Sequence, residues 1–180
     1  MNSTMIDTTI PAEFIESYNT HDDAKKNRDV DPYVDSPFRI YKQMSSKRKG
    51  KFFELLVAEY CQHLGFTVER AKTTEYDRLI NGQRCEIKGS TLWGDGSQFR
   101  WQQIRPHQEY DLMIFLAMYP ERVDMFSSTK EEVRDYVAHP DGDGFWKCNQ
   151  HGGKSVNSGT FFLDGFPEDF KFMRSLYWNL

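Results

Sequence analysis

The dipeptide Asn81-Gly82 constrains the fold of this chain more than any other feature. A two-residue Asn-Gly turn supplies positive φ at both central positions and is the strongest short-range signal of a β-hairpin. It predicts two antiparallel strands, Tyr76–Ile80 and Gln83–Lys88, whose residues pair outward from the turn. In that register Asp77 lies directly opposite Glu86.

The predicted register gathers charges on one face of the hairpin. Carboxylates directly opposite each other have Cβ atoms about 4.5–5.5 Å apart, and like charges so placed are destabilising. A divalent cation would relieve the repulsion between Asp77 and Glu86. Lys88 shares the face of Glu86 because side chains alternate along a strand. Two carboxylates, a lysine and open water positions suit Mg²⁺-assisted phosphodiester cleavage. Two alternatives stay open: the carboxylates face solvent without an ion, or Lys88 pairs across the strands with Glu75, which lies opposite it.

The Asp-x8-Glu-x-Lys pattern that starts at Asp77 resembles the PD-(D/E)xK nucleases, the restriction-endonuclease-like superfamily. The segment upstream of it is similar to the first core helix of archaeal junction resolvases and many restriction enzymes. There Glu54 comes early in an amphipathic helix, which is followed by Leu-Gly-Phe and a strand. The resemblance covers about residues 47–127. It departs from the family at Tyr76, which stands where the family motif carries Pro.

The resemblance implies a role for each residue of the motif. Asp77 and Glu86 would be metal ligands, joined by the backbone carbonyl of Ile87. Oxygen ligands and high hydration suit Mg²⁺, with Mn²⁺ as a substitute. Lys88 would orient the attacking water and stabilise charge that develops on the phosphate.

Two further positions match the family less directly. Glu54 resembles the helical acid that assists the metal site, although a Glu near a helix N-terminus is also favourable for the helix dipole alone. Gln102 and Gln103 begin the region where the family often carries a glutamine that faces the site. We predict Gln103 as the site-facing residue of the two.

The remaining pattern predicts an α/β fold: a restriction-endonuclease-like αβββαβ core with a mixed central sheet flanked by helices. Residues 1–36 are predicted to be an acidic arm or a dimerisation element that includes a candidate short helix, Ala12–Tyr18, and residues 37–180 are predicted to form a single domain. The other expected elements are a helix capped by Ser45 or Ser46 and ended by Gly65, strand Phe66–Arg70, helix Arg100–Gln108, strands Leu112–Met118 and Val123–Ser127, a helix from Ser128 or Thr129 to Val137, strand Thr160–Leu163 and helix Pro167–Trp178.

Positive charge is concentrated where the candidate site lies. The net charge of the chain is −4, yet residues 37–107 carry 13 basic and 7 acidic side chains. Affinity for DNA depends on a local basic face rather than on global charge. An ordinary solvated helix start is the alternative interpretation of the basic run at residues 47–51. The expected DNA contacts are Lys47, Arg48, Lys49, Lys51, Arg100, Arg105 and Lys154.

Several classes of protein are excluded by what the sequence lacks. No apolar run approaches the ~20 residues of a membrane span, and the N-terminus does not read as a signal peptide. Cys61, Cys85 and Cys148 are odd in number, which favours buried free thiols in a reducing, cytoplasmic compartment. The full Gly-x4-Gly-Lys-Ser/Thr phosphate-binding loop that would point to a nucleotide cofactor is absent, because Cys148 stands where the first glycine before Gly153-Lys154-Ser155 would be, and no histidine pair has zinc-ligand spacing.

These features together predict a Mg²⁺-dependent endonuclease that acts on double-stranded DNA. Our first expectation is a type II restriction endonuclease acting as a homodimer, because one site per chain cuts one strand of a palindrome. A Holliday-junction resolvase or a DNA-repair nuclease is the second expectation. A non-catalytic DNA-binding module on the same fold is the alternative from another class.

Overall fold

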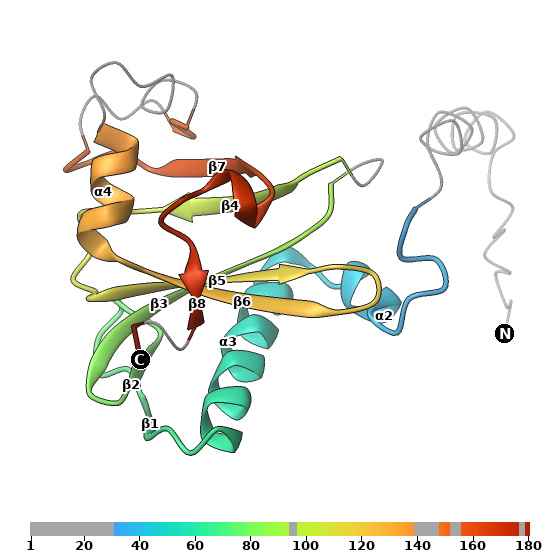
Figure 1. The fold of residues 1–180 in the computed structure, drawn as a ribbon, viewed down its shortest axis with the longest axis horizontal. Coiled ribbons are helices and arrows are strands. Elements are labelled where there is room, and N and C mark those ends of the chain that lie inside the picture. Colours follow the sequence, from blue (N-terminus) through green and yellow to red (C-terminus); the bar gives the residue numbers. More distant parts are fainter. Residues whose placement is uncertain (1–30, 94–96, 139–147, 152–155, 177–178) are drawn as a thin grey trace, which may run out of the picture.

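The computed structural model describes residues 31–93, 97–138, 148–151, 156–176 and 179–180 (Figure 1). Six strands form one mixed sheet in the order β1-β2-β3-β5-β6-β8, and β4 pairs with β7 in a second sheet. Figure 1 shows α3 against one face of the large sheet, with β4, β7 and α4 against the other. The predicted mixed central sheet flanked by helices is thus confirmed. The elements are α2 (Arg39–Lys42), α3 (Ser46–His63), β1 (Val68–Arg70), β2 (Arg78–Ile80), β3 (Gln83–Thr91), β4 (Phe99–Ile104), β5 (Leu112–Met118), β6 (Val123–Thr129), α4 (Lys130–Ala138), β7 (Phe161–Gly165), the 3₁₀ turn η1 (Pro167–Asp169) and β8 (Arg174–Ser175).

The β2–β3 hairpin forms in the predicted register. Asn81 and Gly82 have φ of 49° and 80°, as the two-residue turn requires. Ile80 pairs with Gln83, and the ladder ends where Arg78 pairs with Cys85. The register therefore leaves Asp77 just beyond the last paired residue of β2.

Strand β5 lies at the centre of the core, parallel to β3 and antiparallel to β6. All seven of its residues are buried, which explains why its sequence is a continuous apolar run. Parallel neighbours need a crossover connection, and here the chain from β3 to β5 passes through β4. The Trp101 indole N–H donates to the Leu116 carbonyl over 3.2 Å and joins the two sheets.

The expected helix Arg100–Gln108 is wrong, because its first half is strand β4. Phe99 and Trp101 are fully buried while Arg100 between them is not, which is the alternation of a strand rather than a helix. The aromatic residues pack between the two sheets, with Phe99 and Trp101 ring centroids 5.4 Å apart. Tertiary burial of these rings selects the strand.

Helix α3 carries the side chains that cover the site strand from one face. Its buried residues are Phe53, Val57, Ala58 and Cys61. Gly65, with φ of 86°, follows the C-cap as predicted. Ser45 holds the N-cap position as predicted, although its side chain makes no capping hydrogen bond. Gly89 of β3 lies directly under Phe53, where an added Cβ would come within 2.1 Å of the ring.

In the C-terminal half, helix α4 forms as predicted, but the secondary structure after residue 166 differs from the prediction. Thr129 caps α4 as expected, since its Oγ1 accepts the Glu132 N–H at 3.2 Å and Glu132 Oε2 accepts the Thr129 N–H at 2.9 Å. The expected continuous helix Pro167–Trp178 is wrong: within the described part of that segment, the 3₁₀ turn η1 is followed by strand β8, which pairs with β6. Phe170 and Phe172 are buried against Trp101 and Phe115, and this packing replaces the helix.

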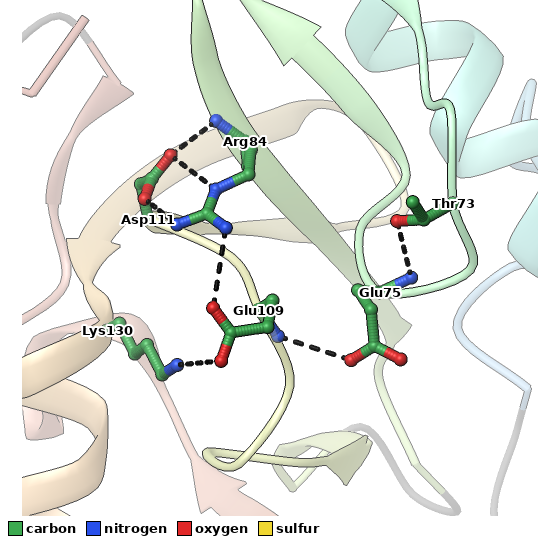
Figure 2. Close-up of polar contacts among 6 residues, drawn as sticks. All are labelled: Thr73, Glu75, Arg84, Glu109, Asp111 and Lys130. Carbon is green, nitrogen blue, oxygen red and sulfur yellow. Dashed lines mark hydrogen bonds and ion pairs between the residues drawn. The ribbon is translucent and has the colours of Figure 1, made fainter.

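A polar network holds the start of β5 against β3 (Figure 2). Arg84 Nε donates to Asp111 Oδ2 at 3.0 Å and Arg84 NH2 donates to Asp111 Oδ1 at 2.6 Å. The Arg84 guanidinium holds the pKa of Asp111 below its usual value. Glu109 lies between Arg84 and Lys130, at 3.4 and 4.0 Å, and its N–H donates to Glu75 Oε2 at 3.3 Å. Glu75 therefore belongs to this network.

The segment before α2 packs onto the body of the protein through Tyr33. Tyr33 is fully buried, and its hydroxyl donates to the Met118 carbonyl and accepts the Leu92 N–H.

The expected helix Ala12–Tyr18 lies outside the described residues, and the division at residue 36 stays a prediction. In the described part of the chain, no helix is long and apolar enough to cross a membrane.

The three cysteines are free and buried, as predicted. Burial raises the pKa of the Cys61 and Cys148 thiols to about 11. A thiol with so high a pKa carries little thiolate at neutral pH, so neither is an activated nucleophile.

Candidate active site

Asp77 is fixed beside β3, directly before the first residue of β2. Its N–H donates to the Cys85 carbonyl at 2.9 Å, and its Oδ2 accepts the Ile87 N–H at 2.8 Å. The carboxylate takes the place that the next backbone carbonyl of the ladder would occupy. It therefore lies against β3 beside Glu86; Glu86 is buried and Asp77 is half-buried.

Lys88 makes an ion pair with Glu86 over 2.7 Å between Nζ and Oε1. Both side chains point away from α3, on the face where the Ser90 hydroxyl accepts the Arg100 N–H of β4 at 2.9 Å. The alternative pairing with Glu75 does not form, because Glu75 accepts from the Glu109 backbone (Figure 2). The amine is thus held on the same face as the metal-ligand candidates.

The carboxylates oppose each other electrostatically, as the register predicted. The pKa of Asp77 rises from 3.8 to about 7, first through burial and then through the negative charge of Glu86. Glu54 adds to the rise, while the Ile87 N–H and the Lys88 charge act against it. A group held in this environment is stabilised by any added positive charge.

Glu54 reaches the site from α3 but is already ion-paired. Its Oε2 lies 2.7 Å from Lys51 Nζ and 3.4 Å from Arg78 NH1. Arg78 NH1 also donates to the Asp77 carbonyl at 2.7 Å, which ties the helix to the end of β2. Glu54, Lys51, Arg78 and Asp77 border one hollow of about 590 Å³. This is the position expected of a helical acid beside the site.

The donor set fits a hydrated hard cation. The N–H and C=O of one strand residue point to the same edge, so the Ile87 carbonyl, like its N–H, points past the end of β2. Among the described residues, no group of three or more His, Cys, Asp or Glu side chains could hold a metal ion. The available donors are therefore the carboxylates of Asp77 and Glu86 and one carbonyl. Mg²⁺ is commonly bound through one or two carboxylates and keeps several waters.

Gln102 and Gln103 lie at a bulge in β4 that borders the face of Lys88. The β4–β7 register shifts between Trp101 and Ile104, and Gln103 has φ of 57°. The side chain of Gln150 holds the bulge: its Oε1 accepts the Gln103 N–H at 2.8 Å and its Nε2 donates to Gln102 Oε1 at 3.2 Å. Both Gln102 and Gln103 line a hollow of about 330 Å³ together with Lys88. Non-glycine residues with positive φ are often found at functional sites.

The expected DNA contacts fall into different places. Lys49 and Arg100 line the hollow that contains Lys88, and Lys51 lines the hollow that contains Asp77. Lys47 and Arg48 are exposed on the first turn of α3. Arg105 borders a separate hollow beside Glu75, and Lys154 lies outside the described residues.

Trp93 also lines the hollow of Lys88, and the sequence did not single it out. It follows β3 at the edge of a Gly- and Ser-rich stretch, where no periodicity marks a side chain as buried or exposed. The one feature of the sequence that could have indicated a place near the site is that Trp93 follows the motif lysine, Lys88, by five residues.

Comparison with known proteins adds a weak structural similarity. No family model matches the chain, and no curated protein matches it. Among solved structures, the chain is similar to a bacterial homing endonuclease, with a TM-score of 0.42 and 14% sequence identity. The similarity covers 64% of this chain and 86% of that chain. No family follows from a similarity of this size.

Proposed function

We propose that this chain is a metal-dependent DNA endonuclease of the PD-(D/E)xK type. The observation that carries the proposal is the grouping of Asp77, which directly precedes β2, with Glu86 and Lys88 of β3. The raised pKa of Asp77 supports it, because the pair of carboxylates is destabilised unless a cation or a proton joins it.

Each residue of the group has a definite task in this proposal. Asp77, Glu86 and the Ile87 carbonyl would hold Mg²⁺, with Mn²⁺ as a substitute. The bound ion would supply Lewis acidity at the scissile phosphate. Lys88 places an ammonium where negative charge develops on the phosphate and orients the attacking water. Its pairing with Glu86 keeps the ammonium oriented before DNA arrives.

The proposed substrate is duplex DNA, and the proposed subclass is a type II restriction endonuclease. Lys49 and Lys51 border the two hollows that contain Lys88 and Asp77, so the basic residues of α3 flank the candidate site. One site per chain cuts one strand, which supports action as a homodimer with two-fold symmetry.

The proposal is tested by cleavage of a complex linear DNA, a supercoiled plasmid and a four-way junction, each with Mg²⁺, Mn²⁺ or EDTA. Wild-type protein is expected to give discrete fragments with either ion and none in EDTA. Lys88→Ala is expected to cut at least about 100-fold more slowly, because one electrostatic group at a reacting centre supplies that much. Lys171→Ala, on the exposed turn after η1, serves as the control and is expected to cut like wild type.

The outcomes separate the alternatives. Linearised plasmid indicates paired sites in a dimer, whereas cutting of the junction alone favours a resolvase. Binding without cutting of any DNA in either ion contradicts the proposal and favours the non-catalytic module.

A further inference from the structure

Trp93 presents an exposed aromatic ring at the rim of the candidate site. Nearly half of the residue's surface, 46%, is accessible to solvent. Its backbone is anchored, because the Trp93 N–H donates to the Gln98 carbonyl at 2.8 Å. A large exposed ring on an anchored backbone is a surface on which a flat ligand can stack.

The guanidinium of Arg100 packs against one face of the Trp93 ring. The Arg100 guanidinium lies over the Trp93 ring, 4.6 Å from its centroid, and over the Phe162 ring at 5.1 Å. Arg100 Nε donates to Asp164 Oδ1 at 2.6 Å, and NH2 pairs with Asp164 Oδ2. The fork-to-fork ion pair fixes the guanidinium, and the cation–π contact fixes the indole. The pair with Asp164 thus lets Arg100 hold the platform in place, and its predicted contact with DNA stays a prediction.

The platform and the motif lysine border the same hollow. Trp93 and Lys88 line one cavity of about 330 Å³, and Lys49 of α3 also lines it. Trp93 follows Lys88 by five residues, so the two residues border this hollow from one segment of the chain.

Other exposed aromatic residues differ from Trp93 in their surroundings. Phe52 and Tyr60 of α3 are also partly exposed, but they border a groove whose remaining lining is Phe38, Leu56, four residues of β6, Ser175 and Leu176, with no basic side chain. Trp93 combines an aromatic face with lysines and a fixed arginine. Basic grooves with an aromatic platform are the arrangement that binds unstacked nucleobases.

We infer that the Trp93 ring is a stacking platform for one unpaired nucleobase of the bound DNA, in the hollow that Trp93 shares with Lys88. This inference rests on the proposed function and narrows its substrate. The preferred DNA contains a base that is single-stranded, bulged or extruded near the cut, and the indole receives that base.

The test is equilibrium binding of fluorescein-labelled oligothymidine and of a labelled duplex, in EDTA so that no cutting occurs. Trp93→Ala is expected to bind oligothymidine about 10- to 100-fold more weakly than wild type. Trp93→Phe is expected to keep most of the affinity, because a phenyl ring still stacks. Tyr60→Ala removes an exposed aromatic residue from the apolar groove and is expected to bind like wild type.

A second measurement locates the base. Duplexes with a single bulged thymine at successive positions around the cut are expected to bind wild type more tightly at one position, and Trp93→Ala equally at all positions. Equal binding of oligothymidine by wild type and Trp93→Ala overturns the inference while leaving cleavage, and hence the proposed function, intact. A wild-type protein that neither cuts nor binds any of these DNAs overturns both.

Discussion

Replacing Asp77 with Asn is expected to abolish DNA cleavage and, at the same time, to stabilise the metal-free protein. Asn keeps an oxygen to accept the Ile87 N–H, so the end of β2 keeps its hydrogen bond. It removes the half-buried negative charge beside Glu86, and it removes a carboxylate that the proposed ion needs. Loss of one metal ligand is expected to slow cleavage by more than about 1,000-fold, while DNA binding is retained.

The stability change has a definite sign and pH range. The Asp77 pKa rises from 3.8 to about 7 on folding, so the folded state favours the neutral carboxyl. This carboxyl costs no stability below about pH 4, an increasing amount from there to pH 7, and a constant amount above. By linkage the cost at pH 8 is about 2–4 kcal/mol, and Asn avoids it.

Urea unfolding in EDTA at several pH values measures this change. Asp77→Asn should be more stable than wild type at pH 8 and similar to it near pH 4. Asp135→Asn, an exposed carboxyl on α4, is the matched control and should differ little at either pH. A variant less stable than wild type at pH 8 would show that the carboxylate is not held under repulsion.

Gly89→Ala adds a single methyl group and is nevertheless expected to lower the free energy of unfolding substantially. The added Cβ would come within 2.1–2.3 Å of three ring atoms of Phe53, so the ring and α3 must move away from β3. Overpacking of this kind costs about 1–3 kcal/mol and occasionally more, and the severity of this contact points to the upper end. Because Gly89 follows Lys88 directly, the displacement also reaches the candidate site.

The matched control is Gly50, which lies on α3, the helix that carries Phe53. An added Cβ at Gly50 in α3 meets nothing within 4 Å, so Gly50→Ala is expected to stabilise by about 0.5–1 kcal/mol through helix propensity. A double-mutant cycle completes the test by urea unfolding: in a Phe53→Ala background, Gly89→Ala should cost much less than in wild type. Additive costs of Gly89→Ala and Phe53→Ala would contradict the contact.

The sequence predicted those parts of the fold that local chemistry decides. The Asn81-Gly82 turn set the hairpin register, and Gly65 marked the end of α3, because both positions need a positive φ. The apolar run of β5 required burial on both faces. The opposition of Asp77 and Glu86 followed from the register alone.

The errors arose where distant contacts override local preference. Arg100–Gln108 has no helix breaker before Pro106, but Phe99 and Trp101 are buried between two sheets and make this segment a strand. Pro167–Trp178 begins as a helix should, and burial of Phe170 and Phe172 then ends it after one turn. The surroundings of Trp93 depend on Asp164, which is remote in sequence. Asp164 forms the ion pair that fixes Arg100 against the Trp93 ring.

The most direct test of the central claim is the position of a bound ion in a crystal of the protein grown with Mn²⁺ and DNA, located by anomalous scattering. We expect an Mn²⁺ peak within about 2.2 Å of oxygens of Asp77 and Glu86 and of the Ile87 carbonyl, with waters completing the coordination. The same crystals of Asp77→Asn should lack that peak. Mn²⁺ bound elsewhere, or Asp77 and Glu86 without an ion in the DNA complex, would contradict the account.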